Sequence, residues 1–103
     1  MNRENDGLRA VIFQDGDLWI AQCLEYDIGV QAYDLDTVRR RLDLAVEIER
    51  RTSLEIHEKE FAEIDPAPTR FFEMWERRLR QFETKPEVNK DGASLTLDLA
   101  LCA

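Results

Sequence analysis

A tight hairpin near the start of the chain limits the possible folds more than any other feature. Two runs rich in β-forming residues, 8–13 and 18–24, flank residues 14–17, which have Asp15-Gly16 at their centre. Asp-Gly between apolar runs is a strong hairpin signal, because Gly readily adopts the left-handed backbone that tight turns require. The sequence therefore predicts two antiparallel strands joined by a short turn.

The next segments extend this hairpin into a three-stranded meander followed by a helix. Residues 28–33 form a third strand after a polar break, and Ile28, Val30 and Ala32 share one of its sides. The apolar residues that follow lie within about 100° on a helical wheel, as expected for a helix that faces a core: Leu35, Val38, Leu42, Ala45 and Val46. Residues 8–52 therefore predict a βββα core with the helix packed on one face of the sheet.

The start of this helix carries two local signals. Asp34 is a candidate N-cap, because its carboxylate can accept backbone N–H groups of the first turn. Tyr33 and Val38 stand at the two positions of a hydrophobic staple, which would fix the angle at which the chain enters the helix. We therefore expect the helix to begin directly after Asp34.

Two apolar residues of this helix, Leu44 and Ile48, lie off the core stripe. They can pack against the second half of the chain or against another subunit. Residues 49–52 are the expected end of the regular helix, although residues 53–60 can extend it or begin a second short helix. Residues 53–66 are predicted to be a connector.

The second half of the chain predicts an amphipathic helix over residues 67–83. Asp65-Pro66 is a typical helix start, since proline needs no N–H there. The large apolar residues of this segment again lie within about 100°, opposite a charged side: Phe71, Phe72, Trp75, Leu79 and Phe82.

Residues 95–102 alternate cleanly and predict a half-buried terminal strand, with Leu95, Leu97, Leu99 and Leu101 on one face. An isolated strand is unstable, so it must pair with this chain's own sheet or with a neighbour's. We expect self-association, as a homodimer or larger assembly, through this leucine face together with the aromatic helix. The predicted fold is a single α+β domain over residues 1–103.

Composition favours a protein partner over a nucleic acid. The chain has 103 residues and a net charge of −8, with 22 acidic and 14 basic side chains. Nonspecific nucleic-acid binding needs an excess of Lys and Arg, so the charge disfavours direct DNA binding, while a basic protein would be attracted. We find no signal peptide and no apolar run of about 20 residues that could span a bilayer. A cytoplasmic location and two free thiols, Cys23 and Cys102, are the expectation.

No residue pattern predicts catalysis or a cofactor. His57 is the only histidine and lies in a charged stretch, which is typical of a solvent-exposed side chain. Glu25 and Asp27 lie near strand ends, where two-metal nucleases hold Mg²⁺. A divergent Mg²⁺-dependent nuclease therefore remains an alternative, although polar residues are expected in such a connection. The leading expectation is a non-enzymatic domain without metal or cofactor.

Residues 8–50 also resemble a known family, the HicB-like antitoxin domain. That family is marked by a strand ending in Trp-(Val or Ile)-Ala-x-Cys-x-Glu, matched here by residues 19–25, and by a later strand ending in Gln-Gly. A helix capped by Thr or Asp then follows. The chain departs from the pattern because Ala32 replaces the usual Gly, and residues 34–36 read Asp-Leu-Asp in place of Thr-x-Glu.

The resemblance implies a reduced ribonuclease H-like fold without catalytic carboxylates. It further implies self-association and an antitoxin role, in which the domain covers the active site of a small basic RNA-cleaving toxin of the HicA type. Many family members carry a C-terminal DNA-binding module, but no second helix follows residues 67–83 to form a helix-turn-helix. An orphan member with a different partner is the alternative reading of the resemblance.

Overall fold

The predicted hairpin forms, and Gly16 is the residue at which the chain turns. The computed structural model describes residues 7–84 and 96–102. In it β1 (Gly7–Asp15) pairs antiparallel with β2 (Leu18–Cys23), with Asp15 opposite Leu18. The two turn residues are thus Gly16 and Asp17, and Gly16 has a φ of 64°, a left-handed value that glycine adopts without steric cost.

The sheet has five strands in the order β3-β2-β1-β5-β4, and the terminal strand lies inside it. Beyond β1 and β2 these are β3 (Gly29–Ala32), β4 (Arg80–Thr84) and β5 (Thr96–Leu101). Strand β5 runs parallel to β1, with Leu97 opposite Leu8, whereas the other neighbouring pairs are antiparallel. The terminal strand therefore pairs with this chain's own sheet. The architecture is mixed α+β, with a five-stranded sheet and two helices among the described residues.

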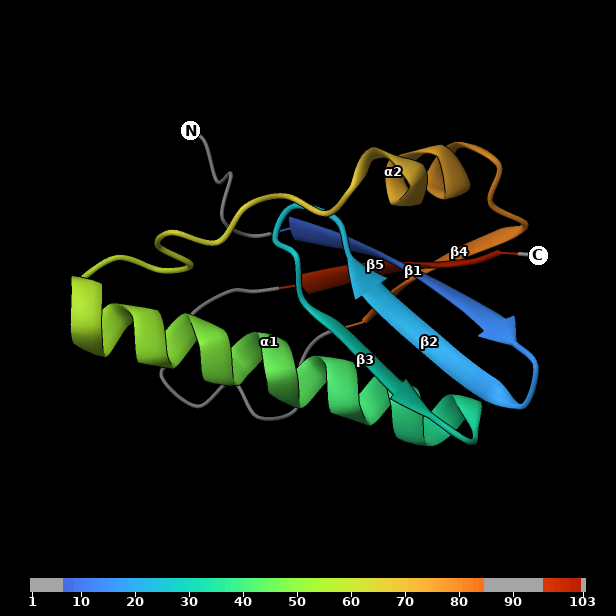
Figure 1. Ribbon diagram of the computed structural model, residues 1–103, viewed down its shortest axis with the longest axis horizontal. Coiled ribbons are helices and arrows are strands. Elements are labelled where there is room, and N and C mark those ends of the chain that lie inside the picture. The colour runs from blue at the N-terminus through green and yellow to red at the C-terminus, as the bar shows by residue number, and fades with distance from the viewer. Residues whose placement is uncertain (1–6, 85–95, 103) are drawn as a thin grey trace.

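Helix α1 (Leu35–His57) covers one face of the sheet. Its buried residues Val38, Leu42 and Val46 pack on strand residues that share that face, among them Ala10, Ile12, Ala21, Cys23, Leu97 and Leu99. Figure 1 shows α1 lying along β3, with its C-terminal turns projecting beyond the end of the sheet. The stripe predicted from the helical wheel is thus the core-facing side of α1.

The capping prediction for α1 is confirmed, but the staple is wrong. Asp34 Oδ1 accepts a hydrogen bond from the Thr37 backbone N–H at 2.7 Å, and this bond lowers the pKa of the Asp34 carboxyl. Tyr33 is 79% exposed while Val38 is completely buried, so the two side chains do not pack together. The helix also continues past residue 52 to His57, where Glu58 caps it in a left-handed conformation.

Helix α2 (Thr69–Glu76) lies on the opposite face of the sheet and is shorter than predicted (Figure 1). Phe71 and Trp75 pack there on a second buried cluster with Val11, Leu24, Ala67, Ala100 and Cys102. The predicted helix over residues 67–83 is therefore wrong after Glu76, and its last residues, from Arg80, belong to β4. Asp65-Pro66 does not start it either, because the N-cap position is Pro68.

Residues 80–84 form strand β4 and not a helix because their backbone pairs with that of β5. The Leu79 N–H donates to the carbonyl of Leu101 at 2.8 Å, and Arg80 lies opposite the same residue at the start of the β4–β5 ladder. Sheet pairing thus outweighs the helical periodicity of the sequence. Within the described ranges, no helix has the length and hydropathy needed to cross a membrane.

Candidate functional site

Two acidic segments that are distant in the sequence lie side by side at one end of the molecule. The β2–β3 connection at residues 25–28 contacts the connector at residues 58–65, and together we call them the acidic end. The Asp27 N–H donates to the carbonyl of Asp65 at 2.7 Å. Beside this bond, the rings of Tyr26 and Phe61 stack with centroids 4.3 Å apart and planes at 14°. The two segments therefore form one surface.

The connector takes its path from an unusual backbone. Glu58, Phe61 and Glu63 all have positive φ values, 59°, 54° and 64°, although none of them is glycine. Such residues are held in place by surrounding contacts. Here the Ser53 hydroxyl accepts the Ala62 N–H at 2.6 Å, and Phe61 is buried in the core under Tyr26.

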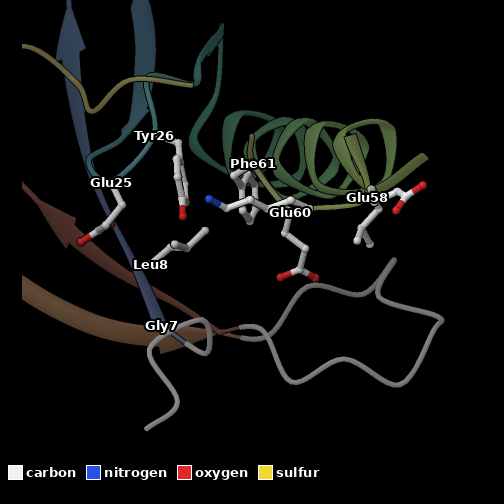
Figure 2. A pocket seen from close by; sticks show the side chains of 9 residues that line it. Gly7, Leu8, Glu25, Tyr26, Glu58, Glu60 and Phe61 are labelled. Carbon is white, nitrogen blue, oxygen red and sulfur yellow. The ribbon is translucent and has the colours of Figure 1, made fainter. Parts of the chain in front are cut away.

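A first hollow of about 310 Å³ opens beside the stacked rings. Figure 2 shows Tyr26 and Phe61 between Glu25 on the strand side and Glu58 and Glu60 on the helix side. Partial burial raises the pKa of the Tyr26 hydroxyl, and the nearby Cys23, Glu25 and Glu60 raise it further. The hollow thus combines an aromatic wall with three carboxylates, and Lys59 is its basic lining residue.

Two of these carboxylates are fixed in place by arginines. Glu25 Oε2 lies 2.6 Å from Arg9 Nε, and Glu25 Oε1 also accepts the Arg9 backbone N–H at 2.7 Å. Glu60 Oε2 accepts from Arg50 Nη1 at 2.7 Å. Such charge-assisted bonds hold the carboxylates in fixed positions at the hollow.

Arg50 connects the acidic end to α1 through a buried ion cluster. Its side chain is 1% exposed, and its Nε and Nη2 donate to both carboxylate oxygens of Glu47 at 3.0 and 2.7 Å. Arg51 Nε also donates to Glu47 Oε2, at 2.9 Å. A buried charge is tolerated when it is paired and hydrogen-bonded in this way. The cluster lies in the C-terminal half of α1 and fixes the connector through Glu60.

A second hollow of about 510 Å³ lies next to the first, and its charged lining residues are all acidic. They are Asp27, Glu49, Glu63 and Asp65. Asp27 Oδ1 accepts a hydrogen bond from Gln22 Nε2 at 2.8 Å, which fixes this carboxylate at the rim. The acidic end therefore offers two hollows: the second has an all-acidic charged lining, while two of the three carboxylates of the first are paired with arginines.

This arrangement is suited to cationic side chains. A guanidinium or ammonium group gains from carboxylates at hydrogen-bonding distance and from the face of an aromatic ring. Glu25 and Asp27, the candidate Mg²⁺ ligands, line different hollows. Among the described residues no group of three or more His, Cys, Asp or Glu side chains could hold a metal ion.

The apolar residues predicted for self-association are divided between the two faces of the sheet. Leu97 and Leu99 belong to the α1 side, and Phe71 and Trp75 to the α2 side; all four are at least 93% buried within the chain. Phe72 and Leu101 are half-buried, and Leu79 is 68% exposed. The side chain of Phe82 and all of Leu95 lie outside the described part of the structure. The described members of this set therefore lie on both faces of the sheet, and self-association through the set stays a prediction.

Sequence reasoning missed the ring pair at the centre of the acidic end. Residues 25–27 were predicted to be a polar break and residues 53–66 a solvated connector. A signal was present, because each segment carries one aromatic residue, Tyr26 or Phe61, among acidic ones. That signal does not indicate that the two aromatics meet.

Comparisons with protein-family models, with curated proteins and with solved structures found no match to this chain.

Proposed function

We propose that this chain is a HicB-like, antitoxin-like protein-binding domain that performs no chemistry of its own. Its partner would be a small basic protein, bound at the acidic end, and the domain would act as a homo-oligomer in the cytoplasm. The observation that carries the proposal is the pair of hollows on either side of the contact between residues 25–28 and 58–65.

The charges of these hollows support a basic partner. The second is lined by four carboxylates, and the first by three beside the stacked aromatic rings, two of them already paired with arginines. The Asp27–Asp65 backbone hydrogen bond and the Tyr26–Phe61 stack hold the two segments together, so the surface is preorganised and little ordering entropy would be lost on binding. Two cationic side chains of one partner could enter the two hollows at the same time.

The resemblance to HicB-like domains adds independent support. The motif at residues 19–25 places Cys23 in the core and Glu25 at the first hollow, where the carboxylate is fixed by Arg9. In the proposed role the motif Glu is therefore both a structural partner of Arg9 and part of the binding surface.

The test is binding to the product of the adjacent gene, provided that this gene encodes a small basic protein. The two proteins are co-expressed, purified and titrated by calorimetry. Glu58→Lys with Glu63→Lys places one positive charge in each hollow, and we expect affinity to fall at least tenfold. Both side chains are exposed, so the fold should be retained.

The matched control replaces two exposed acidic residues elsewhere, Asp17→Lys with Glu73→Lys. This double variant raises the net charge by the same amount, and we expect less than a twofold loss of affinity. Equal losses in the two double variants would indicate general charge attraction without a site. A basic neighbouring protein that does not bind the chain would contradict the proposal.

A further inference from the structure

The outward face of α1 carries apolar residues that stay exposed in the described part of the structure. Leu44 is 48% exposed and Ile48 is 51% exposed, and neither belongs to the two buried clusters. Among the described residues, the second half of the chain does not bury them. The other partner expected from the sequence is a second subunit.

The residues around Ile48 are arranged symmetrically along the helix. Leu44 and Thr52 lie four residues on either side of it, and Arg41 and Glu55 lie seven residues on either side. Spacings of four and seven return to the same face of an α-helix, so all five form one outward stripe. All five side chains are exposed. We call this set the α1 stripe.

The charges of the α1 stripe favour an antiparallel arrangement of α1 in two copies of the chain. An antiparallel α1 with its twofold axis at Ile48 would bring Arg41 of each copy next to Glu55 of the other, about 10.5 Å from the axis. A parallel copy would instead place like charges together, Arg41 against Arg41 and Glu55 against Glu55. Antiparallel pairing also opposes the helix dipoles favourably.

Strand pairing through β3 is a less suitable route to the same dimer. β3 is an edge strand of four residues, and Arg41 Nη1 donates to the Gln31 carbonyl at 2.7 Å. A short edge covered by a charged side chain resists addition of another strand. Arg41 has further donors, so it can bind Gln31 and still meet Glu55 of a second copy.

We propose that the α1 stripe is the interface of a twofold-symmetric homodimer, in which Ile48 packs against Ile48 of the second copy. This interface deepens the self-association proposed above. Because the α1 stripe is short, we expect the dimer interface to bury less than about 1,200 Å², the size typical of weak interfaces. Such a dimer forms at high protein concentration, on the order of 100 µM.

The test is sedimentation of the full chain from 10 µM to 1 mM. We expect concentration-dependent dimerisation that Ile48→Asp weakens at least tenfold, because two like charges then meet at the axis. The matched control is Ile56→Asp, since Ile56 is also exposed, at 67%, but lies on another side of α1. It should leave the dimer affinity unchanged within twofold. Circular dichroism confirms that both variants stay folded.

Two further variants test the symmetry itself. Glu55→Arg should weaken the dimer at least fivefold, and adding Arg41→Glu should restore the affinity to within threefold of the original. Under a mild oxidant Ile48→Cys should form a disulfide-linked dimer, whereas Ile56→Cys should not. The chain's own Cys23 and Cys102 are buried and do not interfere.

Several outcomes would overturn the proposal. A chain that stays monomeric at 1 mM removes self-association altogether, and a dimer that is insensitive to Ile48→Asp must use another surface. A monomer that loses its basic partner on Ile48→Asp would assign the stripe to that partner. Binding of a basic protein is tested separately through Glu58 and Glu63, so failure of the dimer interface and failure of the proposed function are distinguishable.

Discussion

Arg50 is the residue whose burial most affects the stability of the acidic end. Removing one partner of a buried ion pair typically costs about 3–5 kcal/mol. Without Arg50, the buried Glu47 keeps, among the described residues, only its half-exposed partner Arg51. We therefore expect Arg50→Ala to lower the free energy of unfolding by about 3 kcal/mol, measured by urea denaturation, since Glu47 is 3% exposed.

Arg51→Ala is the matched control for this prediction. Arg51 contacts the same Glu47, but its side chain is 48% exposed, so its ion pair is screened by water. We expect a loss of less than about 1 kcal/mol, the usual contribution of exposed pairs. Equal losses for the two variants would show that Arg50 is not the centre of the cluster.

Cys23 gives the protein a defined dependence on alkaline pH. Burial raises the pKa of the Cys23 thiol from 9.0 to about 12. Between these values the unfolded chain releases the proton while the folded chain keeps it, so stability falls as the pH rises. The contribution is complete below pH 9 and is lost progressively towards pH 12. At pH 10 the expected loss is on the order of 1 kcal/mol.

The measurement compares the original chain with Cys23→Ala at pH 7.5 and pH 10. Cys102 also has a raised pKa, is present in both chains and cancels in the difference. Burial raises the pKa of Tyr26 and Cys23 raises it further, so the difference includes this smaller coupled effect. The Cys23→Ala chain should lose less stability over this interval. The same pH dependence in both chains would show that the Cys23 thiol is accessible to water in the folded state.

At the scale of elements, Trp75 and Leu79 test where α2 ends. Both lie on the apolar stripe predicted from the helical wheel, but Trp75 is 7% exposed and Leu79 is 68% exposed. We expect Trp75→Ala to lower the free energy of unfolding by about 3–5 kcal/mol, because it leaves a large cavity. Leu79→Ala should change it by less than about 0.5 kcal/mol. Similar losses would favour a helix that continues to residue 83.

Elements with local signals could be predicted from the sequence. The hairpin at Gly16, the Asp34 cap and the core stripe of α1 depend on residues that are close in sequence, and the structure has them as expected. β4 could not be predicted, because its partner β5 begins twelve residues after β4 ends. Pairing with β5 makes residues 80–84 a strand, although their local sequence favours a helix.

The acidic end could not be predicted for a related reason. Its two segments are about 30 residues apart in the sequence, and neither contains the turn signals that would indicate their path. Glu58 adopts the left-handed conformation as the C-cap of α1. Phe61 is of a type that rarely adopts it, and its stack on Tyr26 holds it there. Non-local contacts therefore determine the candidate site.

At the scale of the whole molecule, the net charge of −8 and the acidic end act over different distances. The net charge attracts a basic partner from afar and is screened by salt beyond about 10 Å at 0.1 M. The carboxylates of the hollows act at contact, where screening is weaker. Salt should therefore slow association more than it speeds dissociation.

We expect the affinity for a basic partner to fall about tenfold between 50 and 500 mM NaCl, mainly through the association rate measured by surface plasmon resonance. Asp17→Lys with Glu73→Lys should slow association at low salt and leave the dissociation rate unchanged, because only the long-range attraction is reduced. Glu58→Lys with Glu63→Lys should also raise the dissociation rate, because these side chains line the hollows. Identical kinetics for these two equally charged variants would mean that the partner binds elsewhere on the molecule.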